Sequence, residues 1–175
     1  MIETEIKILD INKKEIEEKL LKLNAKKILD DNVEAYYFDK DDELRKEGKV
    51  LRLRKIGEKT FLTFKKKIEN KNLSQREEHE TEVNNFENTK LILLNLGYNI
   101  REKVIKHRTS YQINETKFEI DQHLEKDSNI PCLMEIESNE KKIKKYIEIL
   151  NINKDKISKL GFFGLRGYYN KKGTK

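Results

Sequence analysis

The sequence predicts an α+β fold, in which a closed, eight-stranded antiparallel β-barrel has a charged interior and is flanked by amphipathic helices. Three observations support this prediction. Eight short segments alternate with the period of two that is typical of strands. The polar positions of these segments are mostly charged, and several segments carry charges of one sign only. Three other segments place apolar residues at helical spacing.

The first expected strand, residues 2–9, contains the sequence ETEIK. In a strand, Glu3, Glu5 and Lys7 point to one face, because successive side chains alternate. The opposite face receives mainly isoleucines, which suit burial. One strand of this kind alone is usually a solvated sheet face. The pattern therefore becomes informative only if other strands repeat it.

Seven further expected strands lie at roughly 34–39, 50–56, 60–67, 76–83, 104–113, 116–122 and 132–138, and most of them repeat the pattern. Two present bases alone, and two present acids alone: Arg52 with Arg54, Lys106 with Arg108, Glu119 with Asp121, and Glu135 with Glu137. Lys65 shares a face with Thr63, and on residues 76–83 Arg76 lines up with Glu78, Glu80 and Glu82. The sequence INET at 113–116 predicts a hairpin turn.

The three expected helices span residues 13–23, 86–96 and 139–150. Each carries an apolar stripe, so each must cover an apolar surface. Asn12 and Glu15 have the spacing of a capping box before the first helix. Gly97 suits the position that ends the second helix.

Like charges on one face of a strand repel each other, so opposite charge or bound ions must offset them. An eight-stranded barrel supplies opposite charge from across its interior, which is wide enough for side chains or one small ligand. We therefore expect the charged faces to line a tunnel and the apolar faces to point outward, beneath the helices. A purely structural salt-bridge network is the alternative, although buried ion pairs are poor stabilisers.

Six bases in such a tunnel would suit a compact polyanion, because Arg and Lys side chains bind phosphate oxygens. They are Lys7, Arg52, Arg54, Lys65, Lys106 and Arg108. Carboxylates do not bind phosphate directly, but they bind Mg²⁺ or Mn²⁺, which can bridge them to phosphate. The mixture of acids and bases therefore predicts a metal-bound oligophosphate as the ligand.

These motifs resemble the CYTH superfamily, the triphosphate tunnel metalloenzymes. ETEIK looks like the family's ExExK signature, and LRLRK, LTFKKK, REEHETEV, VIKHR, FEID and MEIES follow in a supportive order, from Met1 to about Leu150. The family includes class IV adenylyl cyclases, thiamine triphosphatases, inorganic tripolyphosphatases and fungal RNA triphosphatases. The chain departs from the family pattern where Lys65 precedes two further lysines instead of Gly-Pro, and its C-terminal KLGFFGLRGYY lacks a Ser-Tyr segment.

The resemblance also implies roles for individual residues. The metal ligands would be Glu3, Glu5, Glu135 and Glu137, and the six bases named above would bind phosphate. Glu80 and Asp121 are the implied catalytic residues, which would hold a second metal ion or orient the attacking group. Glu78 and Glu82 would be further acids of the tunnel.

Composition sets the remaining expectations. The 175 residues suit one domain, 1–170, followed by a basic tail, 171–175. Cys132 is the single cysteine, which excludes an internal disulfide and a thiolate metal cluster. No signal-like or membrane-spanning apolar run is present, so we expect a cytoplasmic monomer or homodimer without a membrane partner. The net charge of +6 favours anionic partners only weakly, and the tail lacks the pattern of a nucleic-acid reader.

The leading functional prediction is a divalent-metal-dependent hydrolase that removes the terminal phosphate of a triphosphate. Its substrate would be tripolyphosphate, a nucleoside triphosphate or thiamine triphosphate. A class IV adenylyl cyclase, which converts ATP to cAMP and pyrophosphate, is the second possibility. A non-catalytic module that binds triphosphate or polyphosphate is the third, and a basic RNA-binding barrel is a more distant one.

Overall fold

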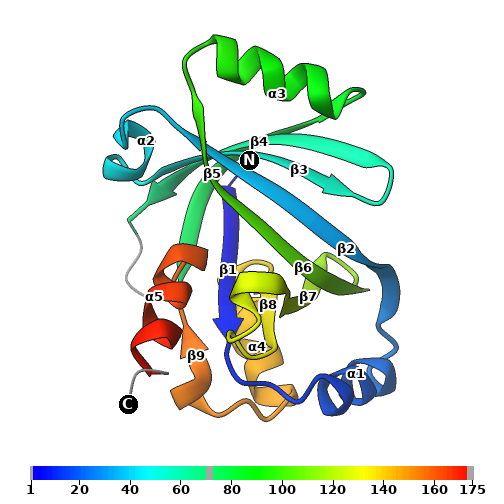
Figure 1. Ribbon diagram of the computed structural model, residues 1–175. Coiled ribbons are helices and arrows are strands. Elements are labelled where there is room, and N and C mark those ends of the chain that lie inside the picture. The colour runs from blue at the N-terminus through cyan, green and yellow to red at the C-terminus, as the bar shows by residue number, and fades with distance from the viewer. Residues whose placement is uncertain (1, 70–72, 173–175) are drawn as a thin grey trace.

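The computed structural model describes residues 2–69 and 73–172, and it confirms the predicted closed barrel (Figure 1). The strands are β1 (Ile2–Ile8), β2 (Lys26–Asp39), β3 (Lys49–Ile56), β4 (Lys59–Ile68), β5 (Ser74–Val83), β6 (Asn99–Ile113), β7 (Thr116–His123), β8 (Leu133–Glu137) and β9 (Ile157–Ser158). Their order in the sheet is β5-β4-β3-β2-β6-β7-β8-β1-β9. An additional pairing of β5 with β1 closes the first eight strands into a ring.

Strand β1 completes the barrel by pairing with different partners along its length. Residues Ile2–Glu5 pair with β5, whereas Glu5–Ile8 pair with β8 on the opposite edge. The short strand β9 pairs with Lys7 and Ile8. Because β8 already occupies the other edge there, β9 continues the edge that β5 leaves after Glu5.

The helices are α1 (Lys13–Lys22), α2 (Glu43–Lys46), α3 (Phe86–Asn95), α4 (Glu140–Ile149) and α5 (Phe162–Lys172), with 3₁₀ turns at Glu125–Asp127 and Lys154–Lys156. The Asn12 side chain accepts a hydrogen bond from the Glu15 amide at 3.2 Å, as the capping spacing predicts. Gly97 has a φ of +89° beyond the end of α3, and its amide bonds to the Leu94 carbonyl at 3.0 Å. These caps fix where the helices begin and end.

Most of the apolar core lies outside the barrel, between its wall and the helices. Ile6, Ile8, Phe118, Met134 and Ile136 on the wall form one buried cluster with residues of α1 and α4. A second cluster joins the outer side of β2–β4 to Leu93 of α3, which lies across that part of the sheet (Figure 1). A third cluster packs α5 against Leu133, and Leu133 and Leu165 of this cluster line the barrel cavity. The first two clusters confirm the predicted outward direction of the apolar faces.

Several elements extend beyond the predicted boundaries. Strands β2 and β6 begin earlier than expected, at Lys26 and Asn99, and they pair over nearly their whole length. Neither extension shows simple apolar alternation, because much of each is exposed. The sequence did not predict α2, β9 or α5. Helix α5 includes Lys171 and Lys172, which were expected in a tail, and residues 173–175 of that tail lie outside the described residues.

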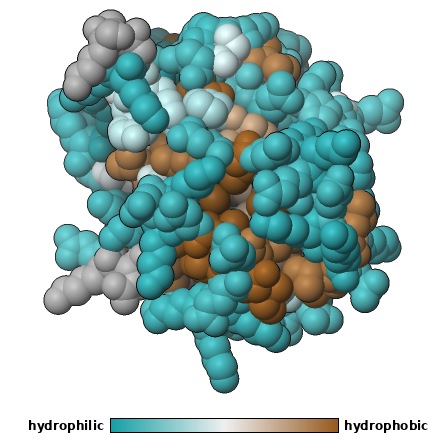
Figure 2. Space-filling model, turned by 90° about the horizontal axis from the view of Figure 1, so that it is seen from below, coloured by the Kyte–Doolittle hydropathy of each residue, from teal (hydrophilic) through white to brown (hydrophobic). Residues whose placement is uncertain are grey.

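Seen from below, hydrophilic residues dominate the visible face of the molecule, with hydrophobic residues in a strip between them (Figure 2). In residues 2–69 and 73–172, no helix is both long and apolar enough to cross a membrane.

The core position of Ile143 gives a test of this architecture. Its side chain is fully buried between α4 and the barrel wall, whereas Ile149 of the same helix is 45% exposed. We expect Ile143→Ala to lower the free energy of unfolding by about 2–5 kcal/mol, because it leaves a cavity. Ile149→Ala should cost well under half as much. Denaturant unfolding of both variants measures the difference, and equal costs would contradict the outward core.

Candidate active site

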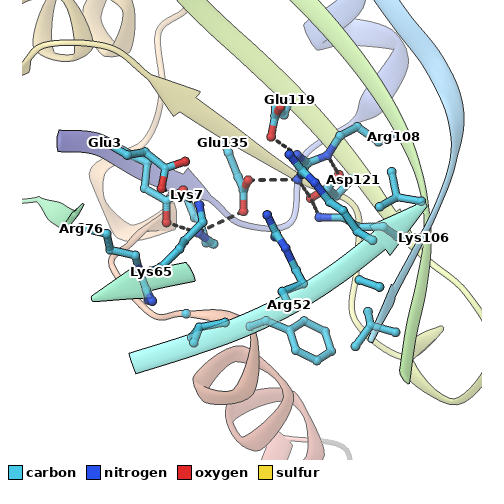
Figure 3. Close-up of a pocket in the computed structure, with 18 of the residues that line it drawn as sticks. Glu3, Lys7, Arg52, Lys65, Arg76, Lys106, Arg108, Glu119, Asp121 and Glu135 are labelled. Atoms are coloured by element: carbon cyan, nitrogen blue, oxygen red, sulfur yellow. Dashed lines mark hydrogen bonds and ion pairs between the residues drawn. The ribbon is translucent and has the colours of Figure 1, made fainter. Parts of the chain in front are cut away.

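A cavity of about 730 Å³ occupies the barrel, and its lining is strongly charged (Figure 3). Among the described residues its lining includes eight acids and eight bases, so their formal charges cancel. The acids are Glu3, Glu5, Glu78, Glu80, Glu119, Asp121, Glu135 and Glu137. The bases are Lys7, Arg52, Arg54, Lys65, Arg76, Lys106, Arg108 and Lys117.

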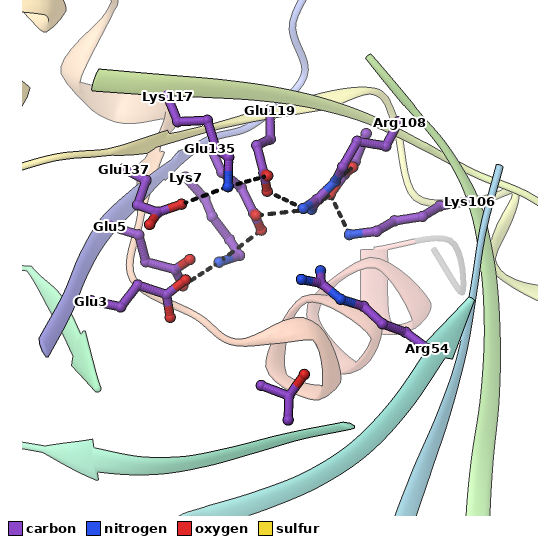
Figure 4. Close-up of polar contacts among 12 residues, drawn as sticks. Glu3, Glu5, Lys7, Arg54, Lys106, Arg108, Lys117, Glu119, Glu135 and Glu137 are labelled. Atoms are coloured by element: carbon purple, nitrogen blue, oxygen red, sulfur yellow. Dashed lines mark hydrogen bonds and ion pairs between the residues drawn. The ribbon is translucent and has the colours of Figure 1, made fainter. Parts of the chain in front are cut away.

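Lys7 joins the first strand to β8 inside the barrel (Figure 4). Its Nζ lies 2.7 Å from Glu5 Oε1 and 3.0 Å from Glu135 Oε1. Burial by itself lowers the pKa of a lysine, but the two carboxylates outweigh it and raise the pKa of Lys7. Lys7 is therefore a permanent cation at the centre of the lining.

Arg108 neutralises acids on two neighbouring strands. Its Nε and Nη2 donate to the two oxygens of Asp121, each at 2.6 Å, and Nη2 also donates to Glu135 Oε2 at 3.1 Å. Glu119 accepts from its Nη1. Glu119 and Glu135 stand directly opposite each other in the β7–β8 ladder. Such a pair of like charges repels, and Arg108 offsets this because it contacts both.

Lys106 and the β7 acids complete this cluster. The Lys106 Nζ lies 2.6 Å from Asp121 Oδ2, so Asp121 is held by two bases. Burial works against ionisation of Asp121, but Arg108 and Lys106 outweigh it and lower its pKa. Asp121 is thus an ionised group in the lining, although only 1% of its surface is exposed.

Arg52 and Arg54 extend from β3 toward Glu80 of β5. Arg54 Nη2 lies 2.9 Å and 3.0 Å from the two Glu80 oxygens, and Thr63 Oγ1 donates to Glu80 at 2.6 Å. Arg52 is farther from Glu80, at 3.7 Å. The Nε atoms of both arginines are buried and have no hydrogen-bond partner among residues 2–69 and 73–172. Buried donors of this kind are costly, so a ligand oxygen that accepted from them would be favoured.

Glu3 of β1 and Glu137 of β8 are carboxyl groups whose pKa values are raised in the folded protein. Lys65 binds Glu3 at 2.5 Å and Glu78 at 3.1 Å. Burial, with a further contribution from Glu78, raises the pKa of Glu3 although Lys65 opposes this. Burial also raises the pKa of Glu137, whose partner Lys117 lies 3.5 Å away. Both carboxylates would be stabilised by additional positive charge.

The carboxylates are chemically suitable ligands for a hard divalent cation. Side chains of Glu3, Glu5, Glu135 and Glu137 lie near one another in the cavity (Figure 4), and oxygen donors are the ligands that Mg²⁺ and Mn²⁺ prefer. Within residues 2–69 and 73–172, no three such groups are arranged to hold an ion as they stand. Lys7 and Lys65 instead hold these oxygens. The donor set fits a cation that would take over these lysine contacts.

All but one of the predicted site residues line this cavity. The exception is Glu82, whose side chain is 53% exposed and pairs with Lys59 at 3.2 Å, so its prediction as a tunnel acid is wrong. Alternation gives the face of a strand but not the point at which the strand passes beyond the cavity. The predicted roles of the other residues remain predictions.

The structure adds lining residues that were not in the predicted set. Lys117 is in phase with Glu119 and Asp121, so its alternation could have identified it, whereas Arg76 and Glu119 were expected on tunnel faces but were given no role. Tyr37, His123, Phe162 and Phe163 also line the cavity. No local sequence signal marks this aromatic group, because its members come from three elements.

The closed antiparallel barrel and its balanced charged lining define the tunnel class of β-barrels that the motifs predicted. The chain belongs to the CYTH domain family, whose model matches residues 1–165. A protein of Methanocaldococcus jannaschii, named "Putative adenylate cyclase", is 29% identical over 174 residues, which cover 95% of this chain and 99% of that protein.

Solved structures share the fold. A Pyrococcus horikoshii protein has a TM-score of 0.79 and 26% identity, over 93% of this chain and 98% of its own. A Hippeastrum protein has a TM-score of 0.69 and 14% identity, with 95% of each chain covered. It is described as a "putative adenylyl cyclase" that reveals a dominant triphosphatase activity. This second likeness, at its low identity, concerns the fold alone.

Two glutamates on β8 should respond in opposite ways to loss of charge. Glu135→Gln should lower the free energy of unfolding at pH 7 by about 3 kcal/mol, because it leaves Lys7 and Arg108 short of a partner. Burial opposes ionisation of Glu135, but these bases hold its pKa well below the ordinary value. The loss should shrink as the pH falls through that lowered pKa, where the native carboxylate itself protonates.

Glu137→Gln should instead raise the free energy of unfolding at pH 7, because the pKa of Glu137 is raised in the folded protein. A carboxyl group whose pKa is raised on folding lowers the free energy of unfolding at pH values above that pKa, and it has no effect at pH values below its pKa in the unfolded chain. The gain from Glu137→Gln should therefore disappear in acid. Urea unfolding with a chelator present, from pH 7 down to about pH 2, measures both variants, because the lowered pKa of Glu135 lies below the range in which Glu137 titrates. Effects of the same sign would contradict this assignment of the electrostatics.

Proposed function

We propose that this protein is a divalent-metal-dependent triphosphatase that hydrolyses the terminal phosphate of a triphosphate inside the barrel. The balanced lining of the cavity is the observation that supports this proposal most. Eight bases can hold a polyanion, but the eight acids leave no net positive charge for it. A bound triphosphate therefore needs accompanying cations, and the acids provide oxygen ligands for them.

The bases divide into two groups by their contacts. Arg108 is saturated by the carboxylates of Asp121, Glu119 and Glu135, so it acts mainly as a fixed part of the framework. Arg52 and Arg54 retain unpartnered Nε donors. These two arginines are the best placed to receive phosphate oxygens, since a guanidinium can donate to two oxygens at once.

The metal ion would be held by Glu3, Glu5, Glu135 and Glu137, where it would neutralise phosphate charge and polarise the phosphoryl group. Binding of a cation there would release Lys65 from Glu3 and Lys7 from Glu5. The freed ammonium groups would then be available to the phosphate chain. The same carboxylates thus keep the lysines in place before the substrate arrives.

Glu80 and Asp121 take different parts in this proposal. Glu80 has an accessible carboxylate beside Arg54, and it can accept a proton or hydrogen bond from an attacking water. Asp121 is fully engaged by Arg108 and Lys106. It is therefore a positioning residue that orients two bases, and it stabilises developing negative charge only through them.

Cyclisation of ATP is the second candidate, and one observation favours it. The Methanocaldococcus jannaschii relative is named as a putative adenylate cyclase and covers nearly all of this chain. The Hippeastrum protein, however, is described as having a dominant triphosphatase activity under a similar name. We place hydrolysis first because water requires only an oriented carboxylate, whereas cyclisation also requires the ribose to be positioned at the α-phosphorus.

A product assay separates the two activities. We expect ATP with Mg²⁺ or Mn²⁺ to yield ADP and phosphate, and tripolyphosphate and thiamine triphosphate are tested in parallel. Chromatography of the products identifies them. Formation of cAMP and pyrophosphate would assign the cyclase, and triphosphate binding without any product would assign a binding module.

Replacement of Glu5 tests the proposed metal ligands. We expect Glu5→Gln to lower kcat by at least about 100-fold, because a neutral amide is a poor ligand for a hard cation. Glu82→Gln is the matched control, since Glu82 lies on β5 outside the cavity and should leave kcat unchanged. Circular dichroism checks that both variants are folded. Metal-dependent turnover that persists in Glu5→Gln would contradict the proposed site.

A further inference from the structure

Helix α3 presents an apolar outer face to solvent. Leu93 is the residue that fixes this helix to the barrel, where it is buried against β2 and β3. Leu91, Ile92 and Leu96 are instead 51%, 59% and 63% exposed. The helix packs chiefly on β3 and β6, and it lies at the top edge of the molecule in Figure 1, away from α1, α4 and α5. Its outer side is therefore an accessible surface.

The exposed apolar surface continues from α3 onto β6. Ile100 pairs in register with Phe38, so the two side chains share a face of the sheet. Phe38 packs with Leu93 in the outer cluster, which places Ile100 beside α3. We call the exposed group the α3 patch; it consists of Leu91, Ile92, Leu94, Leu96 and Ile100. Single exposed apolar residues are ordinary, whereas a group gathered on one face marks an interaction site.

The composition of α3 differs from that of the other helices that cover the barrel. Seven of the ten residues of α1 and six of the ten of α4 are charged, but only two of the ten of α3. These two, Glu87 and Lys90, pair with each other at 2.5 Å. The formal charges of the helix therefore cancel, in a chain whose net charge is +6.

This local neutrality favours a second copy of the same chain as the partner. Two copies that each carry a charge of +6 repel one another, and the repulsion is weakest where an apolar, neutral surface meets its like. A partner of opposite charge would be attracted by basic residues around the patch. On α3 the single base, Lys90, is already paired with Glu87. An apolar surface can also meet its own copy, as a two-fold interface requires.

Two asparagines give the patch polar edges that match under two-fold symmetry. Asn88 is three residues before Leu91, and Asn95 is three residues after Ile92, so both lie on the outer side of the helix. The Nδ2 of Asn95 donates to the Leu91 carbonyl at 2.8 Å, which holds its side chain along this face. A two-fold axis between Leu91 and Ile92 would place Asn88 of each copy opposite Asn95 of the other. Amide side chains both donate and accept hydrogen bonds, so such a pair is compatible.

We propose that the α3 patch binds the α3 patch of a second copy of this chain, with the two helices antiparallel about an axis near Leu91 and Ile92. The aliphatic side chains would fill the centre of the interface, and the asparagine amides would lie at its edge. None of the five patch residues lines the barrel cavity. The inference is therefore independent of the proposed function.

Leu91→Glu is the most direct test, because it places like charges on both sides of the axis. Sedimentation velocity from about 1 to 500 µM measures association, a range that suits a small interface. We expect the wild type to dimerise and Leu91→Glu to raise the dissociation constant by at least about 100-fold. A wild type that is monomeric throughout this range would overturn the proposal, and so would a dimer that persists in Leu91→Glu.

Leu21→Glu is the matched control, since Leu21 of α1 is also an exposed helical leucine, at 55%. We expect it to leave the dissociation constant unchanged, and circular dichroism checks that every variant is folded. An equal loss of association in Leu21→Glu would contradict the assignment to α3.

A mixture of Leu91→Glu with Leu91→Lys tests the position of the axis. Each variant alone should be monomeric, whereas the mixture should form heterodimers, because opposite charges then meet across the axis. A mixture that associates no more than either variant alone would place Leu91 away from the axis and overturn the proposed geometry.

Discussion

Charge compensation across the closed sheet is the constraint on which the rest of this structure depends. Acids face acids directly across the β7–β8 ladder, at Glu119 and Glu135, and this register is tolerable only because Arg108 reaches both. Between β1 and β8, Lys7 contacts the carboxylates of both Glu5 and Glu135. Each of these cations is held by two or more carboxylates. Removal of one charged partner would therefore leave a buried charge without compensation, next to charges of the same sign.

This constraint explains why the hydrophobic core is on the outside. A barrel interior filled with ion pairs contributes little net stability, so folding must draw on apolar contacts elsewhere. The outer faces of the strands supply them, packed beneath α1, α3 and α4. Only one side of the sheet therefore needs apolar residues. A sheet with only one apolar side is consistent with a chain in which 40% of residues are charged and 35% hydrophobic.

The period of two in the sequence was sufficient to predict the barrel and most of its lining. The alternation correctly predicted that Arg52, Lys106 and Glu135 line the cavity, because these parts of their strands border it. It failed at Glu82, which sits on the right face near the end of a strand. The aromatic group that lines the cavity was not predictable in this way. Phe162 reaches Tyr37 only through tertiary packing of α5, whose glycines and aromatic residues show no clear amphipathic stripe.

Strand β1 mechanically links the two ends of the chain. Its last residues, Lys7 and Ile8, pair with Ser158 and Ile157, and only a few residues separate β9 from the start of α5. A shift of α5 away from the barrel would therefore pull on the strand that carries Glu5. The strand that carries Glu5 and the helix that carries Phe162 are thus joined through the backbone hydrogen bonds between β1 and β9.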